Sequence, residues 1–380
     1  MKILVIAHFQ TSDGPVSSFI HDQAKAMREE GHELLVLVPT ALGKSGRGGG
    51  RFLPAVYGEE IDGLRYVFVR FLSLSLLGRY GFNARSTILS LRLSLLGELR
   101  AFAPDIIHAH TLGFDSAIGA WLKKELGCPL AVTTHGSDAV LPLEEGRTEQ
   151  VRRWCEEADA VVCVGEALRA RLSALGLRTP LYKIHNGFND ALLAPLREKT
   201  ALRVLQVCNL YPLKRVDVTL RAFAKIVRRC PGASLTVVGE GGEREKLEAL
   251  SRELGIEGRV RFTGELPHAE VFEQMAGAEY FVMVSSPEGF GIVYLEAMAS
   301  GCVTIGTRGE GIAEVIVSGE NGFLLPPDEP DAIAETILWA IEHPAEREAI
   351  AARGAACAKK LTWRENARQV LALFRSLTDR

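Results

Sequence analysis

The chain has 380 residues, of which 47% are hydrophobic and 24% are charged. This length is too great for one ordinary domain and suits two soluble domains of about 180 residues each. The net charge of −3 gives no support for a nucleic-acid-binding protein, because such proteins usually carry a basic surface. The seven cysteines are scattered and never spaced as Cys-x-x-Cys, which argues against a zinc site or a disulfide framework.

The amino-terminal residues lead directly into an apolar strand at 3–7, without the layout of a signal peptide. No uninterrupted apolar run approaches the roughly 18 residues that a membrane-spanning helix needs. Together with the cysteine pattern, these observations predict a cytoplasmic protein.

The first half of the chain alternates short apolar strands with helices, a pattern that predicts a doubly wound parallel sheet. The strands are expected at 3–7, 34–38, 66–70, 106–109, 130–134 and 160–164. Helices are expected at 16–30, where Gly31 ends the helix, and at 116–126 and 150–158.

The second half restarts the same alternation and predicts a second sheet of the same kind. Its strands are expected at 203–208, 235–238, 260–263, 280–284, 303–306 and 323–325. The boundary between the domains is expected within 191–201, giving domains of 1–195 and 196–360. A final helix is expected at 363–377.

Neither half carries the glycine pattern of a dinucleotide-binding site. Gly239-Glu240-Gly241 lacks the third glycine, the first strand ends in Ala7-His8-Phe9-Gln10, and no P-loop pattern occurs. These observations weaken the interpretation as a dehydrogenase.

The most informative motif surrounds Glu288 and Glu296. The apolar strand before it and the helical spacing after Phe290 place Glu288 in a glycine-bearing loop that opens a helix. Free backbone N–H groups at such a helix start bind anions, and carboxylates accept hydrogen bonds from sugar hydroxyls. A strand, a glycine turn and a helix with solvated glutamates also occur in many α/β proteins. The combination nevertheless suits a nucleotide-sugar.

The full string resembles the signature of retaining GT-B glycosyltransferases of the family 4 type, also called glycosyl transferases group 1. In that family the pattern is Glu-x-Phe-Gly, four residues, then Glu-Ala-Met-Ala-x-Gly, and the segment 288–301 matches every fixed position. The resemblance implies two Rossmann-like domains and transfer of a sugar from a nucleoside diphosphate to an acceptor. It also implies that the final helix, with 361–380, packs back on the first domain, the acceptor side.

The resemblance assigns roles to the donor residues. Glu288 would orient the sugar hydroxyls, Glu296 would bind the ribose, and the backbone N–H groups of Phe290, Gly291 and Ile292 would hold the β-phosphate. Lys214 would neutralise the diphosphate, although a lysine at a helix start can simply be solvated.

Two further positions bear on the strength of diphosphate binding. Asn209 replaces the family's arginine, and the neighbouring Arg215 is expected to compensate in part. Gly14, after the first strand, either lets a phosphate approach or simply forms the turn.

Histidines of the first half follow apolar strands. His135 lies in Thr133-Thr134-His135-Gly136-Ser137-Asp138, which matches a family turn whose histidine contacts the donor sugar. His108 and His110 share one face of a strand, which would permit a metal, but we expect them to be structural or acceptor-side. The turn at His185-Asn186-Gly187 is expected to be structural, and 263–267 is expected to receive the nucleobase.

No Asp-x-Asp occurs in the chain. Divalent ions that hold a nucleotide-sugar prefer clustered carboxylates, so we expect donor binding without a metal and no other cofactor.

The segment 65–100 carries six arginines against one acidic residue, with leucine-rich pieces between them. It predicts either a core helix with a solvated arginine face or an amphipathic surface that docks on an anionic membrane. The glycine-rich residues 43–50 are expected to form a loop near the acceptor side.

The sequence leaves several alternatives open. The donor is UDP- or GDP-linked, GDP-mannose included, and the acceptor a glycan, a lipid-linked sugar or a small molecule, as in polysaccharide synthesis. A second enzyme interpretation is a GT-B sugar synthase or phosphorylase that acts on a small soluble acceptor. A third is a non-catalytic nucleotide-sugar-binding protein, prompted by Asn209.

Overall fold

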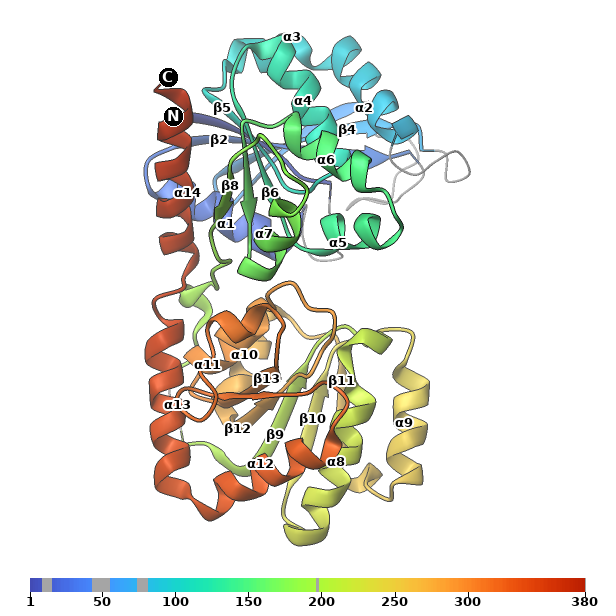
Figure 1. Ribbon diagram of the computed structural model, residues 1–380, viewed down its shortest axis with the longest axis vertical. Coiled ribbons are helices and arrows are strands. Elements are labelled where there is room, and N and C mark those ends of the chain that lie inside the picture. The colour runs from blue at the N-terminus through green and yellow to red at the C-terminus, as the bar shows by residue number, and fades with distance from the viewer. Residues whose placement is uncertain (9–15, 43–54, 74–80, 196–197, 380) are drawn as a thin grey trace. The chain divides into compact units, whose positions relative to one another are not determined.

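The computed structural model describes residues 1–8, 16–42, 55–73, 81–195 and 198–379 (Figure 1). The chain forms two compact units. One comprises Met1–Asn186 together with Trp363–Arg380, and the other comprises Gly187–Thr362.

The first unit is built on an eight-stranded sheet of order β3-β4-β2-β1-β5-β6-β7-β8. All neighbours in it are parallel except β3 and β4. Its inner strands are almost wholly buried, because helices cover both faces of a parallel sheet. The strands are β1 (Lys2–Ile6), β2 (Glu33–Ala41), β3 (Val56–Ile61), β4 (Leu64–Phe71), β5 (Ile106–Ala109), β6 (Leu130–Thr134), β7 (Ala160–Cys163) and β8 (Leu181–Lys183).

The hairpin of β3 and β4 was not predicted from the strand-helix alternation, and neither was the short edge strand β8. Asp62 and Gly63 both have positive φ, at 51° and 72°, so they form the tight two-residue turn that joins antiparallel strands. Strand β3 is half exposed at the sheet edge, and its polar composition hides it from a search for apolar runs.

The helices of the first unit include one from the far end of the chain. Figure 1 shows α14 alongside α1, and buried Gln23 on α1 donates a hydrogen bond to Asn366 on α14 over 2.6 Å. The helices are α1 (Ser18–Glu29), α2 (Gly81–Ser94), α3 (Leu96–Phe102), α4 (Phe114–Leu126), α5 (Ser137–Glu144), α6 (Thr148–Glu156), α7 (Glu166–Ser173) and α14 (Trp363–Thr378).

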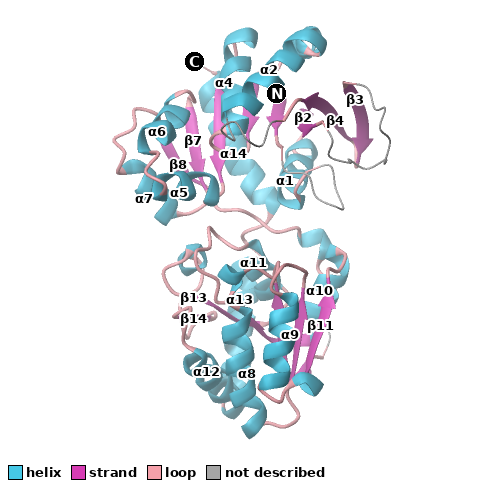
Figure 2. Ribbon diagram, turned by 90° about the vertical axis from the view of Figure 1, so that its right-hand side faces the viewer, coloured by secondary structure: helices cyan, strands magenta, loops and turns pink. Residues whose placement is uncertain are grey.

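The second unit has a six-stranded, fully parallel sheet of order β11-β10-β9-β12-β13-β14, with helices packed around it (Figure 2). Its strands are β9 (Thr200–Val207), β10 (Ser234–Val238), β11 (Val260–Gly264), β12 (Ala278–Val282), β13 (Val303–Thr307) and β14 (Phe323–Leu325). Its helices are α8 (Val216–Arg229), α9 (Arg244–Glu253), α10 (His268–Gly277), α11 (Ile292–Ala299), α12 (Pro330–Glu342) and α13 (Pro344–Ala358). Short 3-10 turns lie at η1 (Asp190–Leu192), η2 (Pro212–Lys214), η3 (Glu257–Arg259) and η4 (Gly311–Glu314). Two doubly wound sheets are therefore present, as predicted.

The units divide between Asn186 and Gly187, earlier than the boundary expected at 195. Phe188 is fully buried, and its N–H donates to the carbonyl oxygen of Leu361 over 3.1 Å. This contact ties the chain after Asn186 to the second unit, so the division between the units falls within the turn at His185-Asn186-Gly187.

The order of strands reverses between β1 and β5 in the first sheet and between β9 and β12 in the second. In open α/β sheets the ligand crevice opens at this reversal, beyond the carboxyl ends of the strands. The loops that follow these four strands are therefore the places to look for a site.

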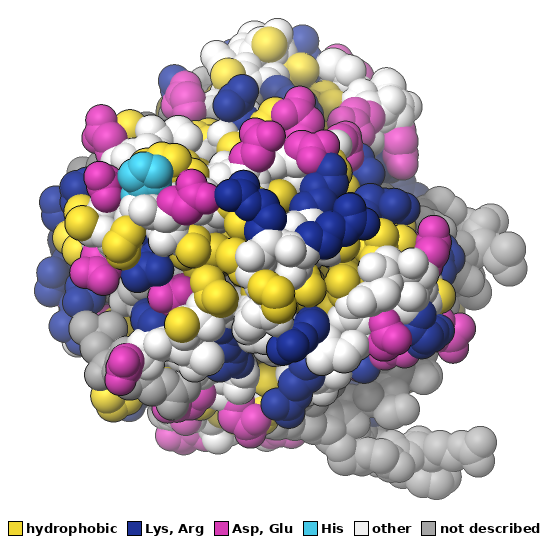
Figure 3. All heavy atoms as spheres, turned by 90° about the horizontal axis from the view of Figure 1, so that it is seen from below, with side chains coloured by type: hydrophobic (Ala, Val, Ile, Leu, Met, Phe, Trp, Pro, Cys, Tyr) yellow, Lys and Arg dark blue, Asp and Glu magenta, His cyan; other side chains and the backbone are white. Residues whose placement is uncertain are grey.

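Basic side chains gather at the opposite edge of the second sheet. Arg228 and Arg229 lie in the last turn of α8 and Arg252 in that of α9, where cations complement the helix carbonyl ends. Figure 3 shows Lys and Arg side chains gathered next to apolar ones on the face seen from below. In the described part of the chain, no helix has the length and apolar character to cross a membrane.

Candidate functional site

Lys214 and Glu288 form an ion pair at the strand reversal of the second unit. Lys214 ends the turn after β9, and Glu288 lies in the loop after β12. The Lys214 Nζ atom lies 2.6 Å from Glu288 Oε2, which also accepts a hydrogen bond from the Ser285 hydroxyl over 3.0 Å. The two side chains are only 20% and 14% exposed, so the pair is largely shielded from water. The sequence analysis gave these residues separate roles, and the structure brings them into contact.

Glu310 fixes the backbone of the loop that carries Glu288. It follows β13, and its carboxylate accepts hydrogen bonds from the Ser286 hydroxyl and from the Glu288 N–H, both over 2.8 Å. Hydrogen bonds to an ionised acceptor are about twice as strong as neutral ones. The sequence analysis missed Glu310. Its position between two glycines, directly after a buried strand, was the signal that it lies at the ligand edge.

Two glycines let the loops of this site approach one another. A Cβ atom on Gly311 would lie 2.0 Å from the carbonyl oxygen of Gly289, a distance that real atoms do not reach. Gly291 has a φ of +73°, which favours glycine, and it begins helix α11. The N-cap residue of α11 is Gly291, which has no side chain to cap the first N–H groups, and such a helix start can bind an anion.

Glu296 lies on α11 and is buried, with only 5% of its surface exposed. Its Oε1 atom lies 2.8 Å from Nε2 of His268, which begins α10. Glu296 is therefore not a solvated residue of a helix face. The sequence analysis did not single out His268, which directly follows the 263–267 segment expected to receive the nucleobase.

The remaining predicted donor residues lie on the loop after β9. Asn209 is exposed, and Arg215 pairs with Asp328 over 3.4 Å at the surface. Gly239 and Gly241 pack against this loop, because a Cβ on Gly239 would lie 2.0 Å from the carbonyl oxygen of Cys208. The incomplete glycine pattern thus has a packing role. Burial raises the pKa of the Cys208 thiol to about 12, so it is neutral at pH 7.

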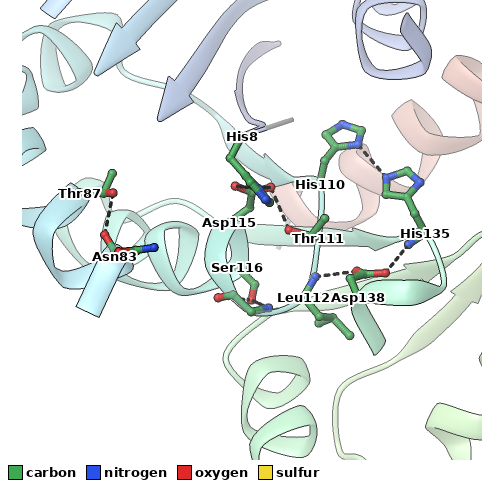
Figure 4. A network of polar contacts seen from close by, with 11 residues as sticks. His8, Asn83, Thr87, His110, Thr111, Leu112, Asp115, Ser116, His135 and Asp138 are labelled. Atoms are coloured by element: carbon green, nitrogen blue, oxygen red, sulfur yellow. Dashed lines mark hydrogen bonds and ion pairs between the residues drawn. The ribbon is translucent and has the colours of Figure 1, made fainter. Parts of the chain in front are cut away.

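In the first unit Asp138 organises the turn that carries His135. Its Oδ1 atom accepts hydrogen bonds from the N–H groups of His135 and Gly136 over 3.0 and 2.9 Å, and Oδ2 accepts one from the Leu112 N–H over 2.8 Å (Figure 4). The turn after β6 is therefore tied to the loop after β5.

Three histidines adjoin one another beside this turn. The His110 Nδ1 atom lies 3.3 Å from His135 Nε2, and the rings of His108 and His110 are 4.2 Å apart. Burial lowers the pKa of all three imidazoles, that of His108 to about 3. They are neutral at pH 7 as a result. In the part of the chain that the structure describes, no three His, Cys, Asp or Glu side chains form a metal-binding group.

A second pair straddles the strand reversal of the first unit. His8 follows β1, and Asp115 lies in the first turn of α4, after β5. Both carboxylate oxygens of Asp115 lie 2.9 Å from His8 Nδ1, and the Thr111 hydroxyl donates to Oδ2 over 2.9 Å (Figure 4). Burial raises the pKa of Asp115, and the neighbouring His8 opposes this shift. The sequence analysis quoted His8 only as the end of a strand and did not consider Asp115.

Gly14 and the predicted loop at 43–50 lie outside the described residues. Within the arginine- and leucine-rich segment, α2 buries Ala84, Thr87 and Leu91. Its other face exposes Leu89 and Leu93, by 58% and 78%, together with Arg85 and Arg92. Because Leu89 and Leu93 are exposed, the outer face of α2 does not consist of solvated arginines alone.

Comparison with known proteins identifies the family. Residues 16–192 match the model described as Glycosyltransferase Family 4, and residues 193–356 match Glycosyl transferases group 1. A D-inositol 3-phosphate glycosyltransferase of Corynebacterium urealyticum is 30% identical over 72% of this chain and 72% of its own length. The chain belongs to the group 1/family 4 glycosyltransferases.

Other members are similar over a comparable length. An N-acetyl-alpha-D-glucosaminyl L-malate synthase of Bacillus anthracis is 32% identical over 62% of this chain, which spans 64% of that relative. Anabaena HepE, solved in complex with UDP-glucose, superposes with a TM-score of 0.76 at 22% identity over 99% of this chain and 100% of that one. The two parallel-sheet units of this glycosyltransferase thus have the GT-B fold, as predicted.

Proposed function

We propose that this glycosyltransferase moves a sugar from a nucleoside diphosphate to an acceptor hydroxyl, with retention of the anomeric configuration and without a metal. The observation that carries the proposal is the Lys214–Glu288 pair at the strand reversal of the second unit, beside the uncapped start of α11. A cation and a helix start attract a diphosphate, and a carboxylate accepts hydrogen bonds from sugar hydroxyls.

The chemistry follows from where charge develops. As the bond from the sugar to the diphosphate breaks, negative charge grows on the departing oxygen, and Lys214 with the N–H groups at 290–292 stabilises it. When the donor binds, Lys214 contacts the diphosphate in place of Glu288, and Glu288 accepts hydrogen bonds from the sugar hydroxyls in place of the one from Lys214. Glu296 remains available to the ribose through the oxygen that His268 does not contact. The predicted contact of His135 with the donor sugar stays a prediction from the resemblance.

The nature of the donor and acceptor is drawn from relatives. Anabaena HepE binds UDP-glucose, whereas relatives named for glucosaminyl-malate and inositol phosphate glycosides point to small anionic acceptors. We favour a UDP-sugar donor on this basis, with GDP-sugars as the alternative. A sugar synthase that acts on a small soluble acceptor, the second enzyme interpretation above, is compatible with this proposal.

The test is release of nucleoside diphosphate from a panel of UDP- and GDP-sugars, with EDTA and without acceptor, against a Glu288→Gln variant. Slow hydrolysis of one donor by the wild-type protein alone would support the proposal and identify the donor. Full activity of Glu288→Gln would contradict the role of the pair, and loss of all activity in EDTA with recovery in Mn²⁺ would contradict the metal-independent mechanism. Thermal stabilisation by one of these nucleotides or their sugars without any release of nucleoside diphosphate would instead favour the non-catalytic nucleotide-sugar-binding protein.

We also propose that the exposed face of α2 docks on anionic membranes. Leucines insert into the interface while Arg85 and Arg92 meet the lipid phosphates, at about 1 kcal/mol per basic residue near the surface. Sedimentation with anionic but not neutral vesicles is expected. Equal sedimentation of wild type and a Leu89→Ser/Leu93→Ser double variant would contradict the proposal.

A further inference from the structure

We propose that His268 is a positioning residue that fixes the Glu296 carboxylate for the nucleotide ribose, and that this pair makes the protein select ribonucleotides over 2′-deoxyribonucleotides. The inference rests on the proposed function, in which Glu296 binds the ribose. It adds the residue that orients this carboxylate and the class of nucleotide that the pair selects. Both residues belong to the second unit.

The first argument is the contact itself. The Nε2 atom of His268 lies 2.8 Å from Oε1 of Glu296. A carboxylate oxygen accepts hydrogen bonds, so Nε2 carries a proton and donates it to this contact. Glu288, the other acidic residue of the motif, is held by both Lys214 and Ser285. Among the residues that the structure describes, His268 alone donates a hydrogen bond to the Glu296 carboxylate.

The second argument is the burial of the pair. The Glu296 side chain is only 7% exposed, whereas that of His268 is 35% exposed. Because a buried carboxylate without a partner is costly, the imidazole stabilises one orientation of the Glu296 side chain. The Oε2 atom has no hydrogen-bond partner within the described part of the chain. The imidazole thus holds one carboxylate oxygen and leaves the other to a ligand.

The third argument is that the two helices carrying the pair are themselves fixed. The His268 ring lies 5.3 Å, centroid to centroid, from the ring of Phe272, which is fully buried one turn further along α10. Near the other end of α10, the Lys199 ammonium donates to the carbonyl oxygens of Met275 and Ser300 over 3.0 and 2.6 Å. This contact ties the end of α10 to the end of α11, so the imidazole meets the carboxylate in a set position.

Selection of ribonucleotides follows from the chemistry of the carboxylate. The 2′-hydroxyl of a ribose donates a hydrogen bond, whereas the 2′-CH₂ group of a deoxyribose cannot. A site built to hydrogen-bond a hydroxyl rejects the analogue that lacks it, because the polar group of the site then stays unpaired. One hydrogen bond to a charged group is expected to make a ribonucleotide bind about 10- to 150-fold more tightly than its 2′-deoxy form.

Loss of His268 is expected to reduce this preference by a particular route. Without the imidazole, the ribonucleotide must itself immobilise the Glu296 side chain, which is expected to weaken its binding about 2- to 12-fold. A deoxynucleotide makes no contact that depends on this orientation, so its Kd is expected to stay the same. The ratio of the deoxy to the ribo Kd therefore falls by the same 2- to 12-fold.

The experiment is calorimetric titration of the full chain with UDP, 2′-deoxy-UDP, GDP and 2′-deoxy-GDP, and the Kd ratio is taken for the base that binds more tightly. His268→Phe and His268→Ala remove the donor with and without a ring, and both are expected to lower the ratio. His268→Gln keeps an N–H donor and is expected to retain more of it than His268→Ala. His343→Phe is the matched control, because His343 stacks on Trp339 between α12 and α13 and belongs to no donor contact described above. A thermal unfolding scan without nucleotide confirms that each variant is folded.

The outcomes separate this inference from the proposed function. A wild-type ratio in both His268→Phe and His268→Ala would overturn the inference, and so would equal weakening of both nucleotides, which marks a merely structural role. A ratio in His268→Gln no higher than in His268→Ala would also overturn it. Equal binding of the ribo and deoxy forms by the wild-type protein would overturn the inference, while diphosphate release in the donor panel would leave the proposed function standing. A wild-type protein that binds none of the four nucleotides and releases none from the sugars would overturn both proposals.

Discussion

Donor binding is expected to respond in a graded way to loss of the two cations after β9. A hydrogen bond to a charged group contributes about 1.5–3 kcal/mol when both partners are shielded from water. Lys214 is 20% exposed and meets this condition. Lys214→Ala is therefore expected to weaken nucleoside diphosphate binding about 10- to 150-fold, at a factor of ten per 1.4 kcal/mol.

Loss of Arg215 is expected to weaken donor binding less than loss of Lys214. Arg215 is 37% exposed and pairs with Asp328, itself 64% exposed, and exposed ion pairs contribute up to about 1 kcal/mol. Arg215→Ala is expected to weaken binding by about fivefold at most. Its partial effect would reflect the compensation predicted for the loss of the family arginine at Asn209.

Calorimetric titration with UDP and GDP measures both steps directly. A Lys214→Ala/Glu288→Gln double variant completes the cycle, and the pair contact predicts that the two changes are not additive. Equal losses in the two single variants would refute the reasoning, because burial would then not govern the contribution. An unchanged Kd in Lys214→Ala would remove Lys214 from the donor site.

Three further changes test the surroundings of the site. Glu310→Ala is expected to lower donor turnover about tenfold, because the Ser286 hydroxyl and the Glu288 N–H lose their acceptor. Glu310→Gln keeps one acceptor oxygen and is expected to lose less turnover. Equal kcat values in the two variants would contradict this role of Glu310. Gly311→Ala is expected to abolish turnover, because its Cβ would meet the backbone, while Gly258→Ala, whose Cβ meets open space, should be silent in the same assay. Finally, buried neutral His108 means that the unfolded chain binds more protons below the ordinary pKa of 6.5. The His108 contribution to the unfolding free energy, followed by urea titration, should therefore fall by up to about 1.4 kcal/mol per pH unit as pH drops from 6.5 toward 3, and His108→Gln should reduce the observed slope by that amount.

The fold was largely predictable from local pattern. Apolar runs bounded by polar loops marked the strands of the second sheet and all strands of the first except β3 and β8, and 323–325 coincides with β14. The β3–β4 hairpin escaped because β3 is an edge strand with polar residues, although Asp62-Gly63 is a known turn signal. The domain boundary lies earlier than predicted, because no local sequence pattern reveals that Phe188 pairs with residues 361–362.

The site was predictable only in part, for a different physical reason. The motif around Glu288 is contiguous, so its loop and helix could be read from spacing. The contacts of Lys214 with Glu288 and of His8 with Asp115 join residues 74 and 107 positions apart. Such pairs depend on which strands become neighbours in the sheet, and this order is set by tertiary packing rather than by local sequence.

The return of α14 to the first unit has a consequence for synthesis on the ribosome. The second unit, Gly187–Thr362, lies in the sequence between α14 and the rest of the first unit and has 176 residues. At about 5–20 residues per second, the ribosome needs roughly 10–35 seconds to complete this stretch. During that time α1 lacks the helix that covers it, whereas the second unit is a single uninterrupted stretch of sequence and needs no later segment to fold. We therefore expect the second unit to complete its folding first, against the usual amino-to-carboxyl order, and the first unit to be the one that needs protection by chaperones.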